Sequence, residues 1–165
     1  MKKADEIIKS LNLTAHPEGG YYKETYRSVE NIPEAALPKR FKRDRSTSTA
    51  IYFLLKSDEP SKLHRIKSDE SWFFHQGTPL VIHSINEAGI YKKEILGLDL
   101  QKKQSPQITV DHDSWFGAEV IEPNSFTLVS CTVSPGFDFS DFELADQDDL
   151  LKIYPQFSKL IKKLT

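Results

Sequence analysis

The residues most able to do chemistry are a histidine and a glutamate in the middle of the chain. His64 and Glu70 fall in two predicted neighbouring strands, Lys62–Ile66 and Glu70–His75. Because side chains alternate across a strand, residues on adjacent antiparallel strands can converge inside a barrel. Such a pair can bind a metal, act as general acid and base, or form a purely structural hydrogen bond. His64 and Glu70 are therefore the candidate catalytic residues.

A second set of candidates consists of aromatic, arginine and glutamate side chains on predicted strands. Aromatic rings can stack on a sugar or a base, and arginines bind phosphate through paired hydrogen bonds. The alternative is that large aromatics fill a barrel interior and that polar groups pair across strands. The candidate ligand-binding residues are Tyr22, Glu24, Tyr26, Arg27, Tyr52, Arg65, Trp72, Trp115 and Phe116.

Short segments rich in β-branched and aromatic residues are predicted to be the strands that position these side chains. They are Tyr21–Arg27, Thr49–Leu55, Lys62–Ile66, Glu70–His75, Leu80–Ile85, Ile90–Leu96, Gln107–Val110, Trp115–Val120 and Phe126–Val133. Their spacing, with turn residues between most of them, is typical of antiparallel sandwiches and barrels. Helical periodicity flanks this region over residues 4–11 and 148–164, with a break at Pro155. The expected architecture is all-β, with a barrel core over about residues 20–135 and short terminal helices.

Three connecting segments allow specific expectations. Residues 31–49 contain the basic run Lys39–Arg45, which predicts either a surface loop or an anion-binding lid over a pocket. Pro135–Phe142 carries three phenylalanines and is expected to pack on the outside of the barrel or at a subunit contact. His16–Gly20 is expected to be a turn that leads into the first long strand.

Length, charge and cysteine content narrow the class of protein. A chain of 165 residues predicts one domain, residues 1–165. With 22 Lys and Arg against 24 Asp and Glu, the net charge of −2 argues against nucleic-acid binding by phosphate neutralisation. The apolar run Ala50–Leu55 is too short to cross a bilayer, the first residues do not resemble a signal peptide, and Cys131 alone allows no internal disulfide. We therefore expect a cytoplasmic protein with no membrane partner.

The spacing around His64 resembles the first motif of the cupin superfamily. That motif places a glutamate and then a glycine after its first histidine, and His64, Glu70 and Gly77 match these positions. Ile66 stands where the motif has its second histidine. In the second motif, Phe116 stands at the place of the last metal-binding histidine.

Two of the usual metal ligands of that superfamily are therefore apolar here, and we expect no cofactor. The turn that precedes the second-motif strand is Asp111-His112-Asp113 instead of a Pro-Gly turn. A metal, if bound, would be held by His64, Glu70 and His112.

Longer blocks resemble one branch of the superfamily, the small single-domain cupins of unknown function. The matching blocks are His16–Ser28, Thr49–Leu55, His64–Arg65, Ser68–Glu70, Trp115–Val120 and Leu128–Asp146. The resemblance implies a cupin double-stranded β-helix, or jelly-roll barrel, and a homodimer. It does not supply an established reaction.

One functional hypothesis comes from metal-free cupins that epimerise deoxy-sugar nucleotides. By analogy, His64 would act as base with Glu70 as its orienting carboxylate, and Tyr22, Tyr26 or Tyr52 would return the proton. A nucleotide or a nucleotide-linked sugar is the expected ligand.

The alternative hypothesis is a protein that binds such a small anionic molecule without transforming it. Arg27, Arg65 and Trp72 would then recognise phosphate and ring. A metal-dependent cupin enzyme that uses His64 and Glu70 is a third hypothesis.

Overall fold

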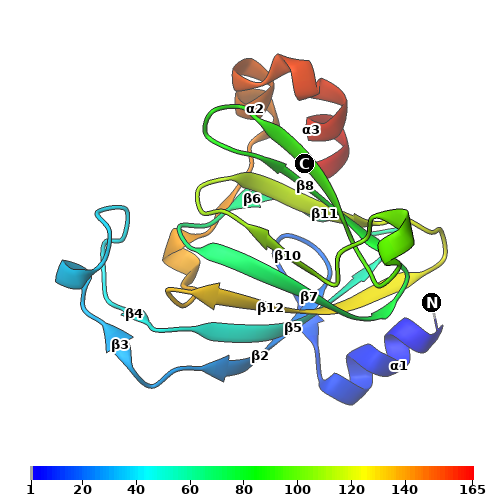
Figure 1. Cartoon of the computed structure of the whole chain (residues 1–165), viewed down its shortest axis with the longest axis horizontal. Coiled ribbons are helices and arrows are strands. Elements are labelled where there is room, and N and C mark those ends of the chain that lie inside the picture. The colour runs from blue at the N-terminus through cyan, green and yellow to red at the C-terminus, as the bar shows by residue number, and fades with distance from the viewer. Residues whose placement is uncertain (1) are drawn as a thin grey trace.

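Two facing antiparallel sheets form the body of the computed structural model, which describes residues 2–165 (Figure 1). One sheet has the strand order β1-β2-β5-β12-β7-β10, the other has the order β13-β6-β11-β8-β9, and β3 and β4 form a separate pair. The strands are β1 Thr14–Ala15, β2 Tyr21–Arg27, β3 Asn31–Ile32, β4 Arg45–Ser46, β5 Thr49–Lys56, β6 Ser61–Arg65, β7 Asp69–Gly77, β8 Leu80–Ile85, β9 Tyr91–Leu96, β10 Gln107–Val110, β11 Trp115–Val120, β12 Phe126–Ser134 and β13 Glu143–Leu144. The jelly-roll architecture expected from the sequence is confirmed.

The predicted long strands all form, and their limits shift by at most a few residues. The observed β7 is longer at both ends than the predicted segment because it pairs with β12 on one side and β10 on the other. The two-residue strands β1, β3, β4 and β13 were not predicted. Such short strands carry too few residues for an alternating pattern to be recognised.

Helices lie at the two ends of the chain. They are α1 Lys2–Leu11, α2 Gln147–Ile153 and α3 Ser158–Leu164, and the 3-10 turns are η1 Glu34–Ala36, η2 Leu100–Lys102, η3 Phe139–Asp141 and η4 Pro155–Phe157. The C-terminal pattern breaks at Pro155 as expected, because proline cannot donate a helical hydrogen bond. Within residues 2–165, none of the helices has the length and hydrophobicity needed to cross a membrane.

The core lies between the two sheets. Phe53, Trp72 and Phe116 are almost fully buried there, together with aliphatic side chains from both inner faces. A second apolar cluster joins the outer face of the five-stranded sheet to α2 and α3, and α1 covers Leu54 and Phe126 on the six-stranded sheet. In Figure 1 the β3–β4 segment projects from one side of the body, away from α1.

Candidate functional site

A cavity of about 330 Å³ opens between the two sheets and is lined by several residues that the sequence singled out. Its buried end carries the polar side chains of His16, Glu18, His64 and Glu70. Apolar side chains of both sheets form its walls, and half-exposed polar groups stand at its open end. A concave apolar site with a few convergent polar groups is typical of small-molecule binding.

His64 on β6 is held rigidly at the buried end. Its ring is 2% exposed and packs against Phe116, with 4.1 Å between the ring centroids. Its Nδ1 lies 2.7 Å from the carbonyl oxygen of Lys62. A carbonyl can only accept, so Nδ1 donates, and the neutral ring therefore carries its free lone pair on Nε2.

The carboxyl group beside His64 belongs to Glu18, a residue to which the sequence analysis gave no chemical role. Glu18 Oε2 lies 3.1 Å from His64 Nε2, and Glu18 Oε1 accepts a hydrogen bond of 2.8 Å from the Ser61 hydroxyl. His16 adds a second nitrogen, because its Nδ1 lies 3.3 Å from Glu18 Oε2. The orienting carboxyl group of His64 is thus Glu18, in place of the expected Glu70.

A tight turn after β1 delivers Glu18 to this position. Gly19 and Gly20 adopt positive φ angles of 108° and 72°, which glycine tolerates without steric cost. A Cβ on Gly19 would overlap the carbonyl oxygen of Pro60, so the turn can approach the start of β6 only with glycine there. The turn is fastened to β6 by a hydrogen bond of 2.8 Å from the Lys62 amide to the Glu18 carbonyl.

The hydrogen-bond partners leave one proton between the Glu18 carboxyl and His64 Nε2. His16 Nδ1 accepts a 3.3 Å hydrogen bond from the Glu18 amide, so it carries no proton, and neutral His64 carries none on Nε2. Burial raises the pKa of Glu18 to about 8, although the Ser61 hydroxyl opposes this shift. Burial lowers the pKa of His64 and of His16 to about 4. At neutral pH the proton therefore resides on Glu18, which donates toward His64 Nε2.

Glu70 on β7 is the second buried acid of the cavity, and it is 8% exposed. Burial raises its pKa to about 8, and the nearby Glu18 carboxyl contributes to this rise. The Cys131 thiol, on the neighbouring strand β12, hydrogen-bonds to Glu70 and opposes the shift only in part. Burial raises the pKa of the Cys131 thiol as well, so it acts as a neutral donor.

Arg27 and Glu24 stand at the open end of the cavity. Two hydrogen bonds, of 3.0 and 2.7 Å, join the guanidinium to the carboxylate, and Arg27 also donates to the Phe137 carbonyl at 3.0 Å. Phe137, Phe139 and Phe142 form one wall beside them. The segment was expected to pack on the outside of the barrel or at a subunit contact, and its rings instead line the cavity, because η3 brings them toward His16 and His64.

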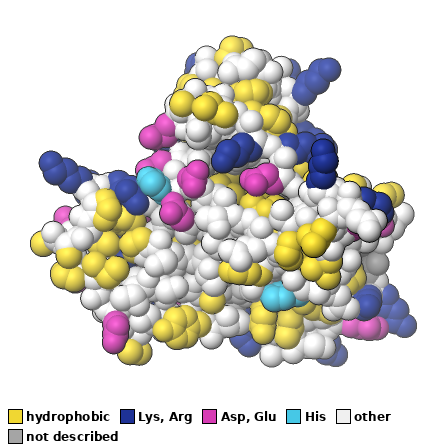
Figure 2. Space-filling model, viewed as in Figure 1, with side chains coloured by type: hydrophobic (Ala, Val, Ile, Leu, Met, Phe, Trp, Pro, Cys, Tyr) yellow, Lys and Arg dark blue, Asp and Glu magenta, His cyan; other side chains and the backbone are white. Residues whose placement is uncertain are grey.

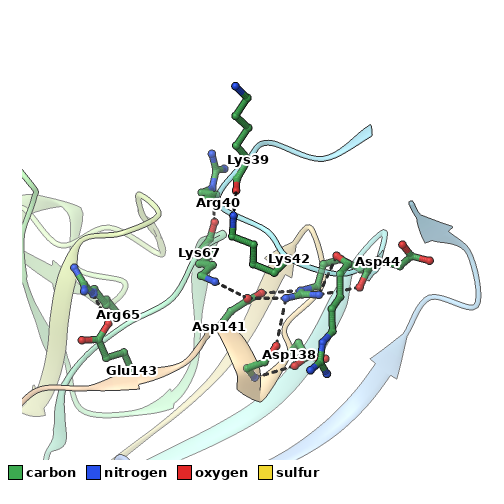
Figure 3. A network of polar contacts seen from close by, with 12 residues as sticks. Lys39, Arg40, Lys42, Asp44, Arg65, Lys67, Asp138, Asp141 and Glu143 are labelled. Carbon is green, nitrogen blue, oxygen red and sulfur yellow. Dashed lines mark hydrogen bonds and ion pairs between the residues drawn. The ribbon is translucent and has the colours of Figure 1, made fainter. Parts of the chain in front are cut away.

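A buried ion pair holds this aromatic wall in place (Figure 3). Arg45 donates to the two carboxylate oxygens of Asp141 at 2.7 and 2.6 Å, and both side chains are almost completely buried. Lys67 lies 3.4 Å from the same carboxylate. The last arginine of the basic run thus fastens the cavity wall, a use that neither interpretation of residues 31–49 included.

Strand geometry decides which predicted ligand-binding residues reach the cavity. Tyr22, Glu24 and Arg27 line it, and Tyr26 does not. Strict alternation along β2 would place the side chains of Tyr22, Glu24 and Tyr26 on the same face of the strand. The pairing with β5, however, shifts register between Glu24 and Tyr26. The irregularity turns Arg27 inward and leaves Tyr26 54% exposed.

The remaining candidates lie elsewhere. Tyr52 is partly exposed beside His75. Arg65 stacks over Trp115, 4.5 Å from its ring centroid, in a separate groove next to α2. Trp72 and Phe116 are core residues behind the cavity.

The residues at the cavity do not fit the metal centre considered above. His112 is exposed and pairs with Asp69 at 2.8 Å, outside the cavity lining. Across residues 2–165, no group of three or more His, Cys, Asp or Glu side chains is arranged to hold a metal ion. His64 Nε2, the nitrogen that a metal would need, faces the Glu18 carboxyl instead.

Comparison with solved structures relates this arrangement to known proteins. The chain superposes with a TM-score of 0.90 on a hypothetical protein from Leishmania major, at 36% identity and 98% coverage of both chains. It superposes with a TM-score of 0.88 on protein SO0799 from Shewanella oneidensis, at 41% identity, covering 98% of this chain and 96% of the other. Oxalate decarboxylase from Bacillus subtilis shares only the fold, with a TM-score of 0.56 and 12% identity over 36% of its length.

Sequence comparison gives the same family. The uncharacterized protein YML079W of Saccharomyces cerevisiae is 30% identical over 166 residues, covering 89% of this chain and 77% of the yeast protein. Residues 5–145 match the family described as cupin superfamily (DUF985). The chain therefore belongs to the DUF985 family of the cupin superfamily.

Proposed function

We propose that this cupin is a metal-independent proton-transfer enzyme of the epimerase or isomerase type, acting on a small sugar-like molecule. The observation that carries the proposal is the 3.1 Å contact between His64 Nε2 and Glu18 Oε2 at the buried end of the cavity. This pair holds one proton between two basic atoms. Once the Glu18 O–H group turns away from Nε2, the pair can accept a second proton from a ligand C–H group on that nitrogen, becoming an imidazolium beside a carboxylic acid.

The surroundings favour such a step energetically. Positive charge that develops on the imidazolium is matched by negative charge that develops on the ligand, in a site whose walls are largely apolar. Tyr22 is the member of the predicted tyrosine trio that lines the cavity, and its ring contacts His16 at 4.6 Å between centroids. It is therefore our candidate for returning the proton, whereas Tyr26 and Tyr52 lie outside.

The cavity volume limits the size of the ligand. About 330 Å³ is at the lower end of the range for small-molecule sites, which is roughly 300–1,000 Å³. The reacting part of the ligand is then the size of one sugar ring, and an anionic extension such as a nucleotide would lie at the open end near Arg27. The nucleotide-linked ligand and the homodimer implied by the family resemblance stay predictions.

Hydrogen–deuterium exchange tests the proposal directly. The protein is incubated in D₂O with a panel of nucleotide-linked sugars, free aldoses and ketoses, and small hydroxy-ketones, and loss of C–H signals is followed by proton NMR. We expect exchange with at least one member, and a loss of about 10²–10⁴-fold in His64→Gln. Tyr52→Phe, outside the cavity, is the matched control and should keep the wild-type rate.

A binding protein without catalysis is the second candidate. It is favoured by the engagement of His64 Nε2 with Glu18, which keeps the lone pair occupied in the ligand-free protein. In that case a panel member would raise the melting temperature while none of its C–H groups exchanged. That outcome would contradict the enzymatic function and support the binding function.

A further inference from the structure

Glu70 differs from Glu18 in having nothing nearby that requires its proton. The Glu18 proton faces the lone pair of His64 Nε2, and His16 Nδ1 lies 3.3 Å from the same carboxyl oxygen. Among residues 2–165, the neighbour that hydrogen-bonds to Glu70 is the Cys131 thiol, and no Lys, Arg or His lies within ion-pair distance. Glu70 is nonetheless more than nine-tenths buried and lines the cavity.

Ionisation of Glu70 would cost a large free energy in this position. A buried carboxylate without a cation loses its hydration and gains nothing in return. The Glu18 carboxyl lies close enough that the two acids disfavour each other's ionisation in the same cavity. Cys131 supplies one weak donor, which satisfies one carboxyl oxygen only.

We propose that Glu70 is a neutral hydrogen-bond donor to the carbonyl oxygen of the substrate, and that the substrates are carbonyl compounds with an exchangeable C–H beside that carbonyl. This inference rests on the proposed proton transfer and adds the group that stabilises the negative charge left on the substrate. His64 accepts the proton from the carbon atom, and the electron pair of the broken C–H bond moves onto the carbonyl oxygen. The Glu70 O–H group donates to the resulting enolate oxygen without giving up its proton. Return of a proton to carbon then regenerates the carbonyl.

The chemistry of the cavity agrees with this division of roles. A carboxylic acid kept neutral by apolar surroundings is a strong donor to an oxygen atom that becomes negatively charged. Glu70 lies on β7 and His64 on β6, so base and donor come from opposite sheets and can face one ligand from two sides. The interior holds neutral acids and neutral imidazoles, and the half-exposed Arg27–Glu24 pair and the Asp138 carboxylate also belong to the lining. A carbonyl group suits that interior better than an ionised one.

The first measurement is the protonation state of Glu70 in the free wild-type protein. Glutamates are labelled with ¹³C at the carboxyl carbon, and the Glu70 resonance is identified by its absence from the Glu70→Gln spectrum. We expect the neutral form to predominate at pH 7. The titratable groups that share the cavity with Glu70 are Glu18, His16, His64, Cys131 and Tyr22, with Arg27, Glu24 and Asp138 also in its lining, so the same titration is repeated in Glu18→Gln. An ionised Glu70 at pH 7 in the wild type would overturn the donor role, whatever the enzyme does.

The second measurement compares two substitutions in the D₂O exchange reaction. Glu70→Gln keeps a donor of similar size and should retain most of the exchange rate, whereas Glu70→Leu removes the donor and should lose about 10²–10³-fold. Circular dichroism and thermal melting establish that both variants are folded. Equal losses in the two variants would mean that Glu70 acts as a carboxylate, and no loss in either would mean that it is not part of the reaction.

These outcomes separate the two proposals. If the wild type exchanges a panel member while Glu70 is ionised, the donor role fails and the proposed function stands. If the wild type exchanges no panel member, the proposed function and the substrate class both fail, and the NMR titration still decides whether Glu70 is a neutral donor.

Discussion

The Nε2 atom of His64 and the Oε2 atom of Glu18 lie 3.1 Å apart and share one proton at the buried end of the cavity. The two residues come from β6 and from the turn that follows β1. Ser61 and Lys62, at the start of β6, hold the Glu18 side chain and backbone. The same short strand therefore presents the histidine and positions its carboxyl partner.

The stability of the protein should fall as the pH rises above neutrality. The folded-state pKa values of Glu18 and Glu70 are raised to about 8, so their protons stabilise the folded state at low pH. This contribution is lost as the pH rises from the unfolded-state value near 4.5 through about 8. His64 and His16, with pKa values lowered to about 4, act in the opposite sense between about 6.5 and 4.

The opposing contributions largely cancel between about pH 4.5 and 6.5, so the decline should be concentrated between about pH 6.5 and 8. Denaturant unfolding across this range measures it. Glu18→Gln cannot lose a proton and should flatten the decline. A variant that declines as steeply as the wild type would contradict the neutral state of Glu18.

Removal of Arg45 should destabilise the protein strongly. Arg45→Met leaves the buried Asp141 carboxylate without its guanidinium, which costs about 3–5 kcal/mol in comparable buried pairs. The aromatic wall of the cavity should loosen as well, so binding of any panel ligand should weaken. Urea unfolding of Arg45→Met gives the stability change.

The matched control is Arg65→Met, which removes the exposed ion pair with Glu143. Exposed pairs contribute about 0–1 kcal/mol, so this variant should unfold close to the wild type. Figure 3 labels Arg65 with Glu143, and Asp141 within its own network of polar contacts. Equal losses of unfolding free energy in the two variants would contradict the structural role assigned to Arg45.

Gly19→Ala should disturb the Glu18 turn. The positive φ of 108° costs an alanine about 1–3 kcal/mol, and its Cβ would overlap Pro60. Gly89→Ala is the control, because φ is also positive there, at 73°, but the nearest atom is 3.4 Å away on the Tyr154 side chain. Thermal unfolding should show the larger loss for Gly19→Ala, accompanied by loss of deuterium exchange. Equal melting temperatures would contradict the tight approach of the turn to β6.

The Cys131 thiol should be unreactive in the folded protein. It is buried, and burial together with the Glu70 carboxyl raises its pKa, so little thiolate forms at neutral pH. Labelling by a maleimide should be slow in buffer and complete in denaturant. Rapid labelling of the folded protein would mean that β12 opens readily beside the cavity.

The face seen in Figure 2 carries acidic, basic and apolar side chains intermixed. This distribution agrees with the near-balance of 22 basic and 24 acidic residues in the sequence. The chemically distinctive groups are inside, at the buried end of the cavity.

The sequence by itself determined the long strands, the antiparallel sandwich-or-barrel class and the presence of His64 and Glu70 at one site, and the resemblance to the cupins added the jelly roll. Strand patterns are local, and alternation along β6 and β7 was enough to turn both side chains inward. The same alternation, applied from His64, places the adjacent Arg65 on the opposite face, where the structure has it. That candidate was therefore excludable from the sequence.

Only the tertiary structure decided which groups surround His64. Glu18 reaches it because a glycine turn docks on a strand that is distant in the sequence, and no local pattern encodes that contact. The register shift in β2 places Arg27, and not Tyr26, at the open end. The Arg45–Asp141 pair holds the segment whose three phenylalanines line the cavity. Long-range packing also sets the burial that keeps Glu18 and Glu70 protonated, since desolvation depends on neighbours from both sheets. The sequence supplies the residue types, and their protonation states follow from the packing around them.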